Sequence, residues 1–311
     1  MTHDGRNATA GVSWAMGCAS AYSLSSVVGK DLLGSLGAES MLFWRFGIAA
    51  VLLWTFLLVR HARGGPDPLA VPHLRSLALG MLFATMVYIG FRSLEYLDVS
   101  VYIVIVYIYP VLVVVGSSLF GHHRASPLIW VSLAVVMGGV VLTVPELFGG
   151  VGEISGLGVA IVIFQAFLMA AFMIVSGRVL PPTDGVVQAG WNVLGGTVAM
   201  APLAFGGGLV VPTGLTLVAE VLLFALVPTL LSNVFFYRAM RHIAPGIVAM
   251  VMTAEVALAI VWSVVFLGEE VRGIKLVGAA VVIAGVLLAQ WVIVREGAMP
   301  RDAAPPRSPS P

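Results

Sequence analysis

The sequence alternates long apolar stretches with short interruptions that contain Pro, Gly or charged residues. A helix that crosses a bilayer needs about 20 mainly apolar residues. Dividing the chain at the interruptions predicts ten transmembrane helices, at residues 11–29, 39–60, 74–95, 99–120, 127–145, 156–178, 186–206, 215–238, 246–267 and 273–294. The seventh contains Gly195, Gly196 and Pro202, which indicates a broken or short helix. The pattern predicts an all-α integral membrane protein.

Composition narrows the class of protein further. Hydrophobic residues make up 59% of the 311 residues and charged residues only 10%, whereas soluble domains carry about 25% charged residues. So few charges cannot cover a soluble protein of this size. The net charge of +1 argues against nucleic-acid binding. A single cysteine, Cys18, excludes a disulfide framework and, without a Cys/His cluster, a zinc site. We expect no metal and no cofactor.

Both ends of the chain are polar. Residues 1–10 form a short N-terminal segment before a first helix that we expect to be retained. Residues 299–311 are rich in Pro and Ser and predict a disordered tail. With the N-terminus inside, eleven of the sixteen Lys and Arg lie in cytoplasmic segments. Because such segments retain Lys and Arg, the sequence predicts a multi-pass protein of the cytoplasmic (inner) cell membrane with both termini in the cytoplasm.

The chain also matches itself at an offset of 146 residues, at which residues 92–142 align with residues 238–288. Identical pairs include Arg92 with Arg238, Ser117 with Ser263, Phe120 with Phe266 and Gly139 with Gly285. We interpret the match as a duplication of five helices, with a first repeat at residues 11–147 and a second at residues 148–298. Because five is odd, the second copy enters the membrane from the opposite side. The two repeats are therefore predicted to be inverted.

The loops after the fourth and ninth helices fit this inversion. His122, His123 and Arg124 occupy the first loop, whereas Glu269 and Glu270 occupy the equivalent position on the opposite side. Two adjacent histidines cannot complete a coordination shell, so they do not predict a metal site. Inverted repeats are typical of secondary transporters, in which substrate binds near the middle of the membrane and the halves rock to give alternating access.

Four short motifs resemble, in their order and spacing, those of the EamA-type branch of the drug/metabolite transporter superfamily. They are Arg45-Phe46, Tyr109-Pro110-Val111, Glu255-Val256-Ala257 and Leu267-Gly268-Glu269. The resemblance covers residues 11 to 292 and implies ten helices in two five-helix repeats and the transport of a metabolite. Glu255-Val256 stands where the family has Glu-Pro, which removes the signal for a proline kink in the ninth helix. Gly121-His122 replaces the family's Gly-Glu, which indicates a diverged turn.

Glu255 is the clearest candidate for a functional residue. It lies ten residues after Pro245, about 15 Å into its helix, where an ionised side chain costs about 2.5 to 3.5 kcal/mol on insertion scales. We predict that Glu255 either couples transport to protons or binds a substrate amine, or is a buried structural carboxylate that is hydrogen-bonded or paired with Arg45. Arg45 is in turn predicted either to attract a substrate carboxylate or phosphate, or to lock helices together or snorkel.

Tyrosines and amides complete the predicted substrate site. In a regular helix Tyr102 and Tyr109 share a face and Tyr107 points elsewhere, so Tyr102 and Tyr109 are expected to line the cavity and Tyr107 is not. The other candidates, each with helix packing as the alternative, are Tyr22, Tyr88, Gln165, Asn192 and Asn233.

Together these features predict a secondary transporter and no enzyme. We expect it to export a small metabolite, such as an amino acid or a drug-like solute, by alternating access and with a proton or substrate gradient. No Walker-type Gly-Lys-Ser/Thr motif for ATP is present. The alternatives are an intramembrane lipid-modifying enzyme, which needs converging catalytic side chains, and a channel, which needs repeated polar rings. The expected partners are the small-molecule substrate, protons and the lipid bilayer; a homodimer is left open.

Overall fold

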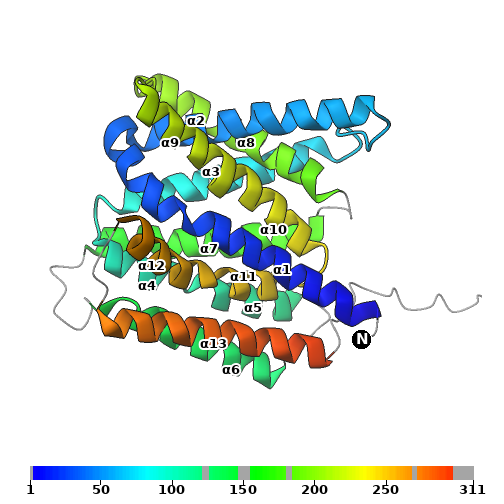
Figure 1. The fold of residues 1–311 in the computed structure, drawn as a ribbon, viewed down its shortest axis with the longest axis vertical. Helices are drawn as coiled ribbons and strands as arrows, with labels where there is room; N and C mark the ends of the chain where they lie inside the picture. Colours follow the sequence, from blue (N-terminus) through cyan, green and yellow to red (C-terminus); the bar gives the residue numbers. More distant parts are fainter. Residues whose placement is uncertain (1–2, 121–125, 146–154, 180–183, 268–271, 297–311) are drawn as a thin grey trace, which may run out of the picture.

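The computed structural model describes residues 3–120, 126–145, 155–179, 184–267 and 272–296, which are helical apart from short connections. The first half of the chain forms α1 (His3–Ser23), α2 (Ser25–Ala62), α3 (His73–Ser93), α4 (Val99–Val106), α5 (Tyr109–Phe120) and α6 (Pro127–Leu142). The second half forms α7 (Gly156–Val179), α8 (Gly185–Gly206), α9 (Leu215–Ala225), the π-helical segment η2 (Leu226–Leu231), α10 (Ser232–Met240), α11 (Pro245–Met252), α12 (Ala254–Leu267) and α13 (Gly273–Glu296). The helices lie side by side as a bundle, with α6 and α13 along one edge (Figure 1).

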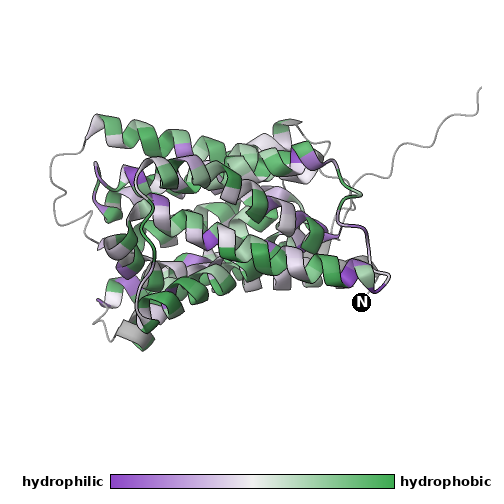
Figure 2. Cartoon of the chain, turned by 90° about the horizontal axis from the view of Figure 1, so that it is seen from above, coloured by the Kyte–Doolittle hydropathy of each residue, from purple (hydrophilic) through white to green (hydrophobic). Residues whose placement is uncertain are grey.

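Seven stretches of the described chain are long and apolar enough to cross a membrane. They lie in α2, α3, α4 with α5, α7, α9 with α10, α11 with α12, and α13. The helix α6 is apolar but shorter. The helices α1 and α8, at the first and seventh predicted spans, lie outside these seven stretches. Figure 2 shows most hydrophilic residues toward the two ends of the bundle, as helices that cross a bilayer require. The chain is thus a multi-pass membrane protein.

The seventh predicted span is not broken, contrary to the prediction. Helix α8 runs without interruption over 22 residues although Pro202 lies within it. Its glycines serve close packing against α3, since a Cβ added to Gly195 would lie 2.3 Å from the carbonyl oxygen of Leu77. Glycine in this helix therefore marks a close contact between two backbones rather than a helix end.

The fourth and ninth predicted spans are the ones that break in the middle. The first break lies at residues 107–108, between α4 and α5, because Pro110 has no N–H and its ring clashes with the carbonyl group four residues earlier. The second lies at Thr253, between α11 and α12, without a proline. There the Thr253 hydroxyl donates to the Met250 carbonyl at 2.6 Å, a local bond that competes with the helix. Residues 107 and 253 are separated by the offset of the sequence match.

Helices α6 and α13 make the closest backbone contact at the edge of the bundle. A Cβ added to Gly139 would lie 2.6 Å from the amide nitrogen of Val282, and one added to Gly285 would lie 3.0 Å from the amide nitrogen of Val136. Gly139 and Gly285 are equivalent at the offset of 146 residues, as are Val136 and Val282. Later residues of α6 meet earlier residues of α13, so the two helices run antiparallel and their contact is reciprocal.

Gly139→Ala is therefore expected to lower the melting temperature of the protein in detergent. The added methyl group forces the two backbones apart, and such overpacking costs about 1 to 3 kcal/mol. Gly138→Ala is the matched control, because no atom lies within 4 Å of a Cβ at that position and Ala favours a helix over Gly by about 0.5 to 1 kcal/mol. Equal melting temperatures for the two variants would contradict the close contact.

Candidate functional site

Glu255 lies in the first turn of α12, directly after the break at Thr253. The first N–H groups of a helix have no partner within it and favour negative charge. Tyr107, at the equivalent break between α4 and α5, donates its hydroxyl to Glu255 Oε1. Tyr107 is buried, but the side chain of Glu255 is only half-buried. The two breaks thus bring a carboxylate with accessible surface and a phenol together.

Three further tyrosines lie in the part of the bundle near this carboxylate. They are Tyr22 near the end of α1, Tyr102 in α4 and Tyr109 in α5, and each lies close enough to Glu255 for its charge to act on the phenol. The rings of Tyr107 and Tyr109 lie with their centroids 6.1 Å apart. That Tyr102 and Tyr109 line the substrate cavity stays a prediction. The expectation that Tyr107 points elsewhere is wrong, because it assumed a regular helix through residues that form a break.

Arg45 of α2 is fully buried, with 1% of its surface exposed. Its Nε donates to Thr229 Oγ1 at 2.6 Å, and an η nitrogen donates to the Pro228 carbonyl at 3.2 Å. Both acceptors belong to η2, where Pro228 has no N–H to donate to Phe224 and the Thr229 hydroxyl donates to the Phe224 carbonyl instead, at 2.9 Å. Arg45 therefore ties α2 to an irregular stretch of backbone.

Aromatic rings cover the remaining surface of the Arg45 guanidinium. Its central carbon lies 4.7 Å from the ring centroid of Phe224, 5.5 Å from that of Phe46 and 5.6 Å from that of Tyr22. Such cation–π contacts are strongest where the cation is shielded from water. Within the described ranges Arg45 forms no ion pair with a carboxylate, so the predicted pairing of Glu255 with Arg45 is wrong. The other form of that alternative, a structural carboxylate held by a hydrogen bond, stays a prediction. Tyr22 contacts Arg45 and lies near Glu255.

Gln165 of α7 extends the polar lining beside Tyr102. Its Nε2 donates to the Tyr102 hydroxyl at 3.1 Å, and its Oε1 is buried without a hydrogen-bond partner. Space for this pair comes from Gly90 of α3, since a Cβ there would lie 2.4 Å from Gln165 Nε2 and 2.9 Å from the Tyr102 hydroxyl. Sequence reasoning identified Gln165 but missed Gly90, because a glycine carries no signal of the side chains that pack over it.

The other predicted residues lie in separate contacts. Asn192 donates to the Tyr237 hydroxyl at 2.8 Å, in a buried neutral cluster that also contains the 3.1 Å bond from Ser76 to Gln188. Asn233, in α10, donates to the Thr229 carbonyl of the preceding η2 segment at 2.8 Å. Tyr88 donates to Glu39 at 2.8 Å. None of these three residues forms a hydrogen bond with Glu255 within the described chain.

Metal binding has no support in the part of the chain that the structure describes. No group of three or more His, Cys, Asp or Glu side chains is placed there to hold a metal ion. His122, His123 and Arg124 lie outside the described residues, as do Glu269 and Glu270. The candidate site is therefore built from one carboxylate, an aromatic wall and neutral polar groups.

Known proteins share both the sequence pattern and the architecture of this chain. The sequence model described as the EamA-like transporter family matches residues 9–144 and again residues 156–291. The pseudopaline exporter CntI of Pseudomonas aeruginosa, in two strains, is 25% identical over 264 residues, which cover 84% of this chain and 89% of the exporter. A crystal structure of a protein with 17% sequence identity superposes with a TM-score of 0.79 over 93% of this chain and 99% of its own.

The two family matches are of equal length and follow one another, in agreement with the duplication inferred from the sequence. They cover most of the chain and include every residue of the cluster around Glu255. A transporter needs a small-molecule substrate and a lipid bilayer, and membership of a transporter family favours transport over catalysis. The chain belongs to the EamA-like transporter family and is a multi-pass membrane transporter.

Proposed function

We propose that the protein is a secondary transporter that exports a small metabolite by alternating access, with Glu255 at its substrate and coupling site. The observation that carries the proposal is the meeting of two helix breaks, at which Tyr107 donates to the half-buried carboxylate of Glu255. Transporters place substrate and coupling ions where interrupted helices meet inside the membrane. The tyrosines around Glu255 then supply an aromatic wall for the apolar part of the solute.

The proposed topology is ten spans in two inverted repeats, at residues 11–147 and 148–298, with both termini in the cytoplasm of a cell with an inner membrane. Two observations support inversion. The breaks at residues 107 and 253 are equivalent in the two repeats, and the reciprocal contact of α6 with α13 is antiparallel. When two equivalent helices run antiparallel and make the same contacts with each other, a two-fold axis relates them. This axis is perpendicular to both helices. For helices that cross a bilayer, such an axis lies in the membrane plane.

The proposed substrate is a small amine-bearing solute such as an amino acid, or a drug-like cation. A carboxylate in an aromatic pocket attracts an ammonium group both by its charge and by the faces of the rings. The same carboxylate can carry a proton when the ammonium group is absent, which gives an exchange of proton for substrate at one site. The relatedness to a protein named as a pseudopaline exporter supports export as the direction.

Counterflow in proteoliposomes tests this function. Vesicles that hold the purified chain and are loaded with unlabelled amino acids or organic cations should accumulate a labelled solute of the same kind against its gradient. An imposed pH gradient should then drive net movement of that solute. A conductive current without counterflow would show a channel, and chemical conversion of the vesicle lipid without counterflow would show a lipid-modifying enzyme; either outcome would refute the proposal.

A further inference from the structure

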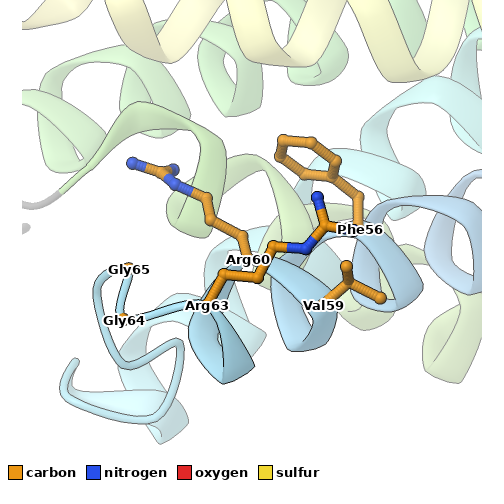
Figure 3. Close-up of a pocket in the computed structure, with 6 residues that line it drawn as sticks. All are labelled: Phe56, Val59, Arg60, Arg63, Gly64 and Gly65. Atoms are coloured by element: carbon orange, nitrogen blue, oxygen red, sulfur yellow. The ribbon is translucent and has the colours of Figure 1, made fainter.

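A hollow of 410 Å³ lies at the end of α2, and none of its residues belongs to the cluster around Glu255 (Figure 3). Its lining residues are Phe56, Val59, Arg60, Arg63, Gly64 and Gly65. Phe56 and Val59 are 54% and 46% exposed, so this wall of the hollow is on the outside of the bundle, where lipid contacts a membrane protein. The other wall is cationic.

A glycine turn shapes the floor of the hollow. Gly64 adopts a φ of 84°, which favours glycine, and the chain then folds back so that the Gly65 N–H donates to the Arg60 carbonyl at 2.9 Å. A Cβ at Gly65 would lie 2.7 Å from that carbonyl oxygen. The last carbonyls of α2 are therefore used by the turn, and no side chain from the turn fills the space beside Arg63.

The two arginines of the hollow have different surroundings. Arg60 points away from Phe56 (Figure 3). It pairs with Asp184, the residue directly before α8, at 2.5 Å. Burial opposes ionisation of Asp184, but bonds from the Val186 N–H and from Arg60 outweigh it and hold the pKa of this carboxyl below its ordinary value. Arg63 is exposed and folds back along α2 toward Phe56 (Figure 3). It has no ion pair within the described ranges, so the hollow holds one uncompensated guanidinium.

We propose that this hollow binds an anionic phospholipid, with the phosphate group on Arg63 and an acyl chain along Phe56 and Val59. A guanidinium presents two parallel donors that match a phosphate group. Phe56 precedes Arg63 by seven residues, about 10 Å along the helix, which fits the step from a headgroup to the upper part of an acyl chain. A soluble phosphate would fill only the cationic end and leave the apolar wall unused.

Lipid-dependent stability of the full chain tests the proposal independently of transport. Phosphatidylglycerol added to the protein in detergent should raise its melting temperature more than phosphatidylcholine does, because a ligand of the folded state stabilises it. Arg63→Gln should weaken the apparent affinity for phosphatidylglycerol about tenfold, as loss of a charge-assisted pair predicts. Arg75→Gln is the matched control, since Arg75 is an exposed arginine at the start of α3 and outside the hollow.

The apolar wall has its own variant. Phe56→Ala keeps both arginines and should also reduce the increase in melting temperature that phosphatidylglycerol gives. Without added lipid, Arg63→Gln should melt with the wild type, because its side chain is exposed. An equal phosphatidylglycerol effect in Arg63→Gln and the wild type would overturn the proposal. Stabilisation by inorganic phosphate alone would also overturn it, and would assign the hollow to a soluble anion.

Discussion

Glu255→Gln is expected to abolish the accumulation of substrate that a pH gradient drives, while substrate exchange continues at a reduced rate. The carboxamide oxygen can still accept the Tyr107 hydroxyl, so the contact between the two helix breaks is kept. The amide has no proton to release, which uncouples the carrier from the gradient. Exchange uses only the substrate-loaded carrier and needs no proton release. Both assays are run on the same proteoliposomes.

Glu39→Gln is the matched control for this prediction. Glu39 is also a half-buried carboxylate that accepts a tyrosine hydroxyl, from Tyr88 at 2.8 Å. It follows the non-helical Gly37 of α2 and therefore lies at the start of the second predicted span, away from the two breaks in the middle of spans that meet at Glu255. Driven uptake should survive in this variant. Unchanged dependence on the pH gradient in Glu255→Gln would place coupling elsewhere. Loss of both driven uptake and exchange in a folded Glu255→Gln protein would show that Glu255 is required for substrate binding itself.

Apolar stretches predicted the helices well because a bilayer imposes one length and one type of side chain on every span. The interruptions within spans were harder to predict. Pro110 and Pro228 carry a direct signal, since a proline removes a donor wherever it lies. Thr253 carries almost none, because a hydroxyl that competes for a backbone carbonyl usually leaves a helix intact. The glycines of α8 led to the prediction of a break that the helix does not have, because glycine is common both at close helix contacts and at helix ends.

Sequence analysis pointed to site residues that are unusual at their depth in the membrane. It missed those that reach the site only through the three-dimensional arrangement of the helices. A carboxylate in the middle of a span drew attention to Glu255, and position along one helix drew attention to Tyr109. Tyr107 was excluded by helical periodicity, although Pro110 three residues later already indicated that the periodicity would fail. The partners of Arg45 were not accessible to pattern analysis at all, because they lie 183 and 184 residues away in a π-helical segment.

Arg45→Lys is expected to destabilise the protein more than any other conservative change of a charged residue considered above. Lysine keeps the buried positive charge and the desolvation cost of burying it. The difference in stability between the variant and the wild type therefore reports on the shape of the donor group alone. One ammonium group cannot reach Thr229 Oγ1 and the Pro228 carbonyl in the fork geometry of arginine, nor lie flat against Phe224. Each lost bond to a charged group is worth about 1.5 to 3 kcal/mol. Thermal unfolding in detergent measures the effect.

Arg92→Lys is the matched control, because it makes the same Arg-to-Lys change at an exposed position. Arg92 is exposed and pairs with Glu95 at 2.6 Å across one helical turn. Because exposed pairs contribute about 0 to 1 kcal/mol, the Arg92→Lys variant should melt at nearly the same temperature as the wild type. Counterflow then distinguishes the two predicted roles of Arg45. If the residue only locks α2 to η2, Arg45→Lys lowers the melting temperature and leaves the preference between a substrate and its carboxyl-amidated analogue as in the wild type. A changed preference at unchanged stability would show that Arg45 contacts the substrate. The Arg45 side chain would then have to move away from the aromatic rings that cover it during transport.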